Sequence, residues 1–418
     1  MAGVTSSYPA ALDSESNLTP PNNGDTLSVA DHWLAGNSGP IVAIETELGT
    51  DPAGSHTNVK NRLDQVDSAM GFKNRIIGGN FSTNPWQRGT SFTAPTMDYT
   101  ADRFTLYDNT SGVVDVLKTA DAPTIVEAGV FTQHCFHVDV TTADSSISSS
   151  DECHMWQAIE GYNLLDLGFG QSGTRYFTLS FWHKHTKTGT NCVAFRNVDA
   201  SKRTYVAEYT QSVSDTWEKA EITVPVDTSG TWNYTNGQGL YVFFSIAMGS
   251  TRHTTAGSWQ SGDFRSTSNQ VNNLDSTSNN FKIALIQLEA GDKATRFETR
   301  SVGQELALCQ RYYQKSYNVN IPPGTANSTL GYILSFAHNT YTLQDGTIRL
   351  PLSMRSSPDV YLYSAVTGAV GKIRDVSAAA DVNVLSLNMG ENGFEVGGNN
   401  NLTANNYYTF NYAVEAEL

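Results

Sequence analysis

The stretch that decides the fold is Tyr176-Phe177-Thr178-Leu179-Ser180-Phe181-Trp182. It is rich in aromatic residues and ends at a turn at 188–190, which is typical of a β-strand. Three further stretches have the same character, namely residues 219–224, 240–246 and 281–288. Because turns and polar loops separate these stretches without helical spacing, residues 73–300 are expected to form a jelly-roll β-sandwich.

The region 301–418 is expected to form an antiparallel β domain after a short helical or extended piece at 305–313. Its last strand has the clearest alternation in the chain, with one face carrying Tyr408, Phe410, Tyr412, Val414, Ala416 and Leu418. A flat apolar edge strand invites aggregation unless something covers it. We expect a second copy of the chain to cover this strand, through Phe410, Tyr412 and Val414.

Helical spacing occurs only in the N-terminal region, residues 1–72, which we expect to form an attachment segment with short helices. One predicted helix follows the turn before Ile41 and ends at Gly49. A second one has coiled-coil spacing, with one face that carries Val59, Leu63, Val66 and Met70. Two heptads are too short to be stable alone, so two interpretations stay open: packing on the same chain, or a small bundle with other copies.

Composition and charge exclude several functions. The 418 residues contain 26 Lys and Arg against 41 Asp and Glu, a net charge of -15 that disfavours nucleic acid as a partner. No apolar run reaches about 18 residues, so we expect no membrane insertion. The first residues lack the features of a secretory signal, and the four Cys are too widely spaced for a disulfide framework. Synthesis in a reducing cytoplasm is therefore expected.

Motifs for catalysis are missing, and we expect no enzyme and no catalytic residues. The chain has no nucleophile elbow, P-loop, HExxH or dinucleotide fingerprint. Carboxylate pairs from separate strands escape such a search, so Glu152, Glu160 and Glu289 remain candidates. The His and Cys residues at 134–137 and 153–154 have no finger-type spacing for zinc. A structural calcium ion held by Glu289 and Asp292 is the one cofactor considered.

Aromatic residues in polar loops are the strongest candidates for ligand binding. Sugar recognition pairs a flat ring with nearby polar groups. The residues that fit this pattern are Trp86, Arg88, Trp232, Tyr234 and Trp259. The alternative for each Trp is that it closes one end of the sandwich.

Several ordered segments resemble a known family. They are residues 74–90 (NRIIGGNFSTNPWQRGT), 99–104 (YTADRF), 157–161 (QAIEG), 178–182 (TLSFW), 287–291 (QLEAG) and 294–298 (ATRFE). This set resembles the carbohydrate-binding-module-like jelly roll of bacteriophage tail fibres and other virion appendages. In the same proteins, similar sequences follow at a junction and a C-terminal tip domain, here 305–313 (ELALCQRYY), 354–358 (MRSSP) and 413–418 (AVEAEL), and residues 47–55 are similar to their short helical leaders.

The resemblance implies a virion structural protein that is usually trimeric. It implies an N-terminal segment that docks on other virion proteins and distal β domains that face the host surface and its glycans. It transfers no catalytic or ligand residues. Since the chain has no long shaft, a stubby fibre or a head or neck appendage fits better than a long tail fibre. Two alternatives stay open: a purely architectural decoration or connector protein, and a polysaccharide-degrading spike.

Overall fold

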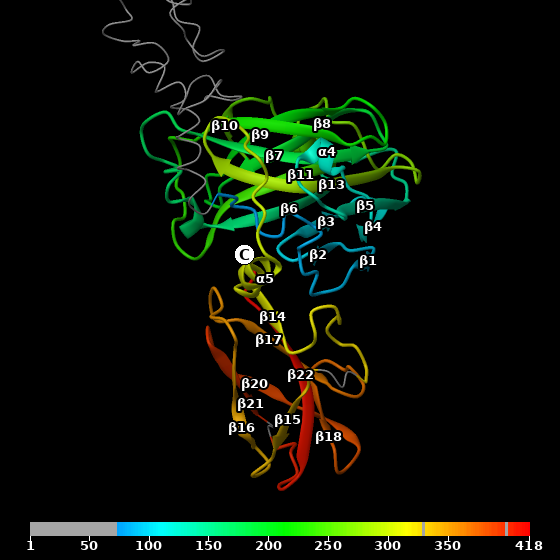
Figure 1. Cartoon of the computed structure of the whole chain (residues 1–418), viewed down its shortest axis with the longest axis vertical. Coiled ribbons are helices and arrows are strands. Elements are labelled where there is room, and N and C mark those ends of the chain that lie inside the picture. Colours follow the sequence, from blue (N-terminus) through cyan, green and yellow to red (C-terminus); the bar gives the residue numbers. More distant parts are fainter. Residues whose placement is uncertain (1–72, 328–330, 398–399) are drawn as a thin grey trace, which may run out of the picture. The chain divides into compact units, whose positions relative to one another are not determined.

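The computed structural model describes residues 73–327, 331–397 and 400–418. The predicted helices with Val59, Leu63, Val66 and Met70 lie outside these residues. Residues 74–418 form one compact unit, and the prediction of a mainly β fold is confirmed. Figure 1 shows a sandwich of two sheets followed along the chain by a second β domain.

The sandwich consists of two antiparallel sheets. The six-stranded sheet has the order β1-β4-β5-β13-β7-β10. Its strands are β1 (Ser91–Thr93), β4 (Val113–Thr119), β5 (Cys135–Thr142), β7 (Tyr176–His185), β10 (Glu218–Pro225) and β13 (Asn280–Ala290). The strands predicted at 176–182, 219–224 and 281–288 are thereby confirmed.

The seven-stranded sheet has the order β12-β9-β8-β11-β6-β3-β2. Its strands are β2 (Met97–Tyr99), β3 (Thr105–Asp108), β6 (Glu152–Glu160), β8 (Gly189–Arg196), β9 (Arg203–Gln211), β11 (Gln238–Met248) and β12 (Trp259–Ser261). The strand predicted at 240–246 is β11. Short helices lie between strands, namely α4 (Ile125–Ala128), η3 (Gly161–Leu164) and η4 (Ser250–Arg252).

One hydrophobic core fills the space between the two sheets. Inward-facing rings of both sheets meet there, as in the edge-to-face pair of Phe177 on β7 and Phe195 on β8, 5.0 Å apart. The other face of the seven-stranded sheet carries a second cluster with Trp156 and Tyr241. Residues from the end of the chain, Tyr312 and Leu418, belong to that cluster. This outer sheet face is therefore covered by the chain itself.

Helix α5 (Val302–Gln310) leads from the sandwich into the C-terminal domain. It begins at a capping box, in which Ser301 and Gln304 satisfy each other's backbone N–H groups. The prediction left residues 305–313 as helical or extended, and both occur: α5 ends at Gln310 and β14 (Tyr313–Lys315) follows.

The C-terminal domain contains two small antiparallel sheets around its own core. The larger one pairs β14, β15 (Ile333–Phe336), β17 (Asp359–Ser364), β18 (Lys372–Asp375) and β19 (Ala380–Asn383) around β22 (Tyr407–Glu415). The smaller one has the order β16-β21-β20, with β16 (Thr342–Arg349), β20 (Leu385–Gly390) and β21 (Gly393–Gly397).

Strand β22 corrects one expectation from the sequence. Its residues 413–415 pair with β14 and also with β17, so neighbours of the same chain occupy both of its edges. Phe410 and Val414 are fully buried, and Tyr412 is 6% exposed. The strand is central rather than at an edge, and its apolar face packs on its own domain. No second copy of the chain is needed to cover it.

Candidate functional site

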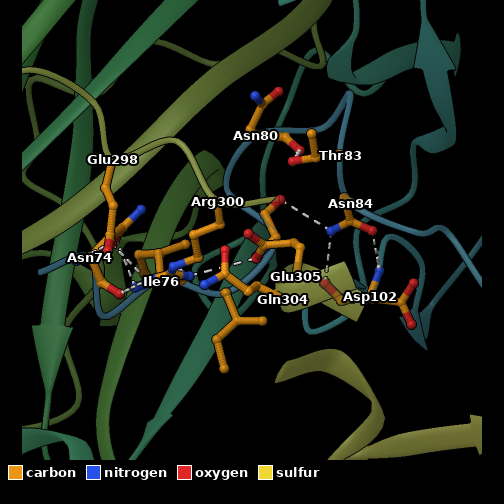
Figure 2. Close-up of polar contacts among 12 residues, drawn as sticks. Asn74, Ile76, Asn80, Thr83, Asn84, Asp102, Glu298, Arg300, Gln304 and Glu305 are labelled. Atoms are coloured by element: carbon orange, nitrogen blue, oxygen red, sulfur yellow. Dashed lines mark hydrogen bonds and ion pairs between the residues drawn. The ribbon is translucent and has the colours of Figure 1, made fainter. Parts of the chain in front are cut away.

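The candidate site is built on the loop at 74–90, which buried amides fix in place. Asn74 accepts a hydrogen bond from the N–H of Leu288 on β13 (3.0 Å). Asn84 and Asp102 face each other in Figure 2: the Asn84 amide donates to the Asp102 carbonyl (3.1 Å) and accepts from the Asp102 N–H (3.2 Å). These side chains satisfy buried backbone groups that no strand ladder satisfies here. The loop is thereby ordered without regular secondary structure.

Helix α5 is attached to the same loop. The Glu305 carboxylate of α5 accepts a hydrogen bond from the N–H of Gly78 and lies 3.6 Å from the Arg300 guanidinium (Figure 2). Arg300 also donates to the carbonyl of Ile76 (3.1 Å). Burial raises the pKa of Glu305, and the charge of Arg300 opposes that rise. The loop therefore links the sandwich to the helix that leads into the C-terminal domain.

Gln87 connects the loop to the C-terminal domain. Its backbone N–H and its side-chain amide donate to the two oxygens of Asp102 (2.8 and 3.1 Å), and the same amide donates to the carbonyl of Tyr313 (3.2 Å). Burial raises the pKa of Asp102, and the nearby charge of Arg88 opposes the rise. These contacts place Arg88, the next residue, beside β14.

Arg88 is held by carboxylates and aromatic rings. Its guanidinium lies 3.1 Å from Glu417 and 3.5 Å from Glu415. The same group lies over the ring of Tyr313, 3.7 Å from its centre, and 5.1 Å from the centre of the Tyr99 ring. A planar guanidinium favours both kinds of contact. Arg88 is therefore held in a fixed position between the sandwich and the last strand, β22.

A cleft of about 420 Å³ opens beside this arginine. Its walls come from the segment 88–99 and from the C-terminal domain, including β17 and β22. The cleft is lined by Arg88, Phe92, Thr93, Pro95, Asp98, Tyr99, Tyr313, Pro323, Tyr361, Tyr363, Ala413 and Glu415. Four tyrosines, one arginine and two carboxylates thus meet in a space of the size that small ligands occupy.

The tyrosine hydroxyls of the cleft stay protonated at neutral pH. Burial raises the pKa of Tyr363 to about 12, and it also raises the pKa of Tyr361. Tyr99 donates its hydroxyl to the carbonyl of Leu418 (2.8 Å). In the described ranges no residue forms a hydrogen bond with the hydroxyl of Tyr361 or Tyr363. These two hydroxyls are available to a ligand, and the ring of Tyr361 is 41% exposed.

This arrangement suits a ligand with both apolar faces and hydroxyl groups. Aromatic rings stack on the C–H faces of sugars, while phenol hydroxyls and carboxylates exchange hydrogen bonds with sugar hydroxyls. Arg88 and Tyr99 are held by contacts within the chain before any ligand arrives, which lowers the entropic cost of binding.

The structure places the five predicted ligand residues in three different environments. Arg88 lines the cleft. The expectation for Trp86 is corrected, because its side chain is only 2% exposed and its ring nitrogen donates to the carbonyl of Phe81 (3.0 Å). A ring enclosed in the sandwich core offers no face to a ligand.

The other three predicted residues come together in one aromatic cluster. Trp232 stacks on Phe169 with ring centres 4.1 Å apart, and Trp259 meets Trp232 edge-to-face at 5.6 Å. Tyr234 donates its hydroxyl to the carbonyl of Phe169 (2.6 Å). Trp232 belongs to the sandwich core, and the half-buried rings of Tyr234 and Trp259 pack against it. Ligand binding by those two rings stays a prediction.

The considered calcium site has other partners for its main residue. The Glu289 carboxylate accepts hydrogen bonds from the N–H (2.9 Å) and hydroxyl (2.7 Å) of Thr295, and from Gln287 (2.8 Å). The backbone carbonyl of Asp292 accepts from Thr223 (3.1 Å). In the part of the chain that is described, no group of three or more His, Cys, Asp or Glu residues could hold a metal ion. Glu289 stabilises the turn that follows β13.

The two other candidate carboxylates form structural ion pairs. Glu160 binds the guanidinium of Arg311 (2.6 Å) and accepts from the Tyr312 hydroxyl (2.6 Å). Glu152 lies 2.9 Å from Arg252. Both carboxylates are buried, and neither lines the cleft.

The sequence prediction missed the tyrosines of the cleft, although a signal was present. The segment Asp359–Ser364 carries Tyr361 and Tyr363 two positions apart, which places both on one face of a strand. What this pattern does not reveal is the neighbour of that strand. Only the pairing of Tyr361 with Ala413 on β22 brings this face to Arg88 and Glu415.

No family model and no curated protein sequence matches the chain. Among solved structures, it is similar to the enzymatically active domain of tailspike protein 4 of bacteriophage CBA120, at 15% identity and a TM-score of 0.29. That match covers 52% of this chain and 21% of the tailspike chain.

Carbohydrate-binding modules are also similar. A family 11 module from Clostridium thermocellum, in complex with a mixed-linked tetrasaccharide, matches at 11% identity and a TM-score of 0.27, over 49% of this chain and 99% of the module. A family 22 module of a xylanase from the same organism matches at 12% and 0.27, over 50% of this chain and 98% of the module. These values are too low to transfer a ligand or a role.

Among the described residues, no helix is long and apolar enough to cross a membrane.

Proposed function

We propose that the chain is a saccharide-binding appendage protein of a bacteriophage, carried on the tail, neck or head of the virion. In this proposal residues 74–418 bind a glycan of the host surface, and residues 1–72 dock on other virion proteins. The protein is made in the host cytoplasm and works on the virion. It binds rather than cleaves its ligand. The resemblance of residues 40–418 to phage appendage proteins supports the virion part of the proposal.

The observation that carries the binding part is the cleft beside Arg88. It combines the exposed Tyr361 and two tyrosine hydroxyls that have no hydrogen-bond partner among the described residues with two carboxylates and with Arg88, which buried contacts hold in place. Binding at this cleft is therefore favoured over the architectural alternative.

Self-association belongs to the same proposal. We propose a homotrimer, because the resembling proteins are usually trimeric and because three linked sites gain avidity without new contacts. Strand β22 supplies no reason for it, since its apolar face is covered within the chain. Light scattering of the full chain tests the trimer: a mass three times that of one chain is expected, and a monomer at micromolar concentration contradicts it.

The binding experiment uses the full chain on an array of purified bacterial surface polysaccharides. Binding to at least one polysaccharide is expected, and Tyr361→Ala and Tyr363→Ala should each weaken it by about tenfold or more, the effect of losing a central aromatic contact. Tyr162→Ala is the matched control, because Tyr162 is an exposed tyrosine on η3 that does not line the cleft. Lack of binding to every polysaccharide would favour the architectural alternative.

A further inference from the structure

We propose that the cleft selects uncharged saccharides and discriminates against acidic ones. This inference rests on the proposed function and adds the ligand class. Recognition of an acidic sugar needs a cation that is free to pair with its carboxylate. Arg88 is the single cation among the described residues that line the cleft.

The charge of Arg88 is already neutralised by the chain. Its guanidinium lies within 4 Å of three carboxylates, those of Asp102 (3.8 Å), Glu415 (3.5 Å) and Glu417 (3.1 Å). Asp102 and Glu417 are buried, with side chains 1% and 4% exposed. An acidic ligand that took Arg88 from them would remove a cationic partner from two buried carboxylates, Asp102 and Glu417, which is unfavourable. Arg88 therefore serves as a scaffold for the cleft and not as a receptor for anions.

The other charged groups of the wall are negative. Both Asp98, which is exposed, and Glu415, which is half-buried, line the cleft. Burial is the main cause of the raised pKa of Tyr361 and Tyr363; the charge of Glu415 adds to the rise at both hydroxyls, and the charge of Arg88 opposes it by a smaller amount. A sugar carboxylate placed against these hydroxyls would be repelled by the same field.

An uncharged sugar fits the same groups without this penalty. Its hydroxyls can donate to Asp98 and Glu415 and can accept from the hydroxyls of Tyr361 and Tyr363, so every polar group finds a partner of the opposite kind. The net charge of -15 on the whole chain adds to the discrimination at long range and at low salt.

The test compares saccharides that differ only in the group at C6, which is a hydroxymethyl group in one member of each pair and a carboxylate in the other. Full-length protein is titrated by calorimetry with hexasaccharides of galactose, glucose and mannose, and with the matched hexasaccharides of galacturonic, glucuronic and mannuronic acid. In each pair that binds, the uncharged member should bind about tenfold more tightly at low ionic strength, and added salt should narrow the difference. Equal or tighter binding of the acidic member would overturn the inference and leave the proposed function standing.

A variant assigns the discrimination to the cleft. Asp98→Asn should lower the ratio of uncharged to acidic affinity by about threefold, because the variant removes one negative charge from the lining of the cleft. Asp199→Asn, which neutralises a half-exposed aspartate of a loop that does not line the cleft, should leave the ratio unchanged. An unchanged ratio in Asp98→Asn would overturn the inference. If the hexasaccharides and the array polysaccharides all fail to bind, the proposed function falls, and this inference falls with it.

Discussion

Glu417 shows how one side chain can hold distant parts of the sequence together. It pairs with Arg88 and with Arg103, which lie 329 and 314 positions earlier in the chain. Arg103 is 1% exposed, and its guanidinium also lies over the ring of Tyr312 at 3.6 Å. Glu417 thus contacts two buried guanidinium groups, and in the described residues it is the carboxylate that forms an ion pair with Arg103, which makes Glu417 a sensitive position.

Glu417→Ala should destabilise the chain by about 3–5 kcal/mol, because it leaves the buried guanidinium of Arg103 without its carboxylate partner. Glu221→Ala is the control: its carboxylate is half-exposed and pairs with Lys219, so its loss should cost about 1 kcal/mol or less. Urea unfolding followed by tryptophan fluorescence measures both changes. Equal effects of the two variants would contradict the buried role of Glu417.

Gly78 carries a second prediction at the scale of single residues. Its φ is +74°, and a Cβ built there would lie 2.2 Å from the Asn84 side-chain nitrogen. Gly78→Ala should therefore cost more than Gly257→Ala, where φ is +90° and the space is open. The two variants share the backbone strain, so their difference in unfolding free energy measures the collision alone. A difference of zero would mean that Asn84 moves aside freely.

At the scale of elements, β22 shows which properties of a strand can be predicted from its own sequence and which depend on its partner strands. Its alternation correctly identifies a strand with one apolar face. The residue pattern of a strand does not identify its partner strands, because pairing also depends on segments far away in the sequence. Here β14, β15, β17 and β18 occupy both edges. The alternation suggested that another copy of the chain covers this strand. Neighbouring strands of the same chain cover it instead.

Phe410→Ala should destabilise the C-terminal domain by about 3–5 kcal/mol, since its ring is fully buried in that core. Tyr407→Ala on the same strand is the control, because Tyr407 is 51% exposed and its loss should change stability by about 0.5 kcal/mol or less. Thermal unfolding checks both variants. A stability of Phe410→Ala that depended on protein concentration would indicate that the ring packs against another copy after all.

The candidate site shows the same division between segments and neighbours. The loop at 74–90 could be singled out from its sequence, and it does position Arg88. Its tryptophan was the more obvious ligand residue, yet Trp86 fills the core. Tyr361 and Tyr363 could be placed on one face of a strand, but the cleft arises only where that strand pairs with β22 beside the loop. Composition and residue spacing do not show that these segments come together in the fold.

At the scale of the whole molecule, buried histidines make stability depend on pH. Burial lowers the pKa of His137 to about 4, and it lowers the pKa of His154, His183 and His185 as well. In the unfolded chain these groups take up protons near pH 6.5. The unfolded state therefore binds more protons than the folded state between pH 6.5 and about 4.

The free energy of unfolding should accordingly fall as the pH is lowered from 6.5 toward 4. Buried carboxylates with a raised pKa, such as Asp102 and Glu305, act in the opposite sense, so a variant is needed to isolate the histidine effect. His137→Gln should show a smaller loss over this range than the unmodified chain. Urea titrations at several pH values measure the slopes, and identical slopes would refute the assignment to His137.

The cleft also has a consequence for the order of events during synthesis. Arg88, Tyr99 and Glu415 all line the cleft, but Glu415 emerges from the ribosome more than three hundred residues after the other two. The sandwich can close its own core early, because domains generally fold as units while the chain is being made. The cleft, by contrast, is completed only when β22 has been translated and inserted between β14 and β17. Formation of the proposed binding site therefore has to wait for a strand that is made long after the sandwich.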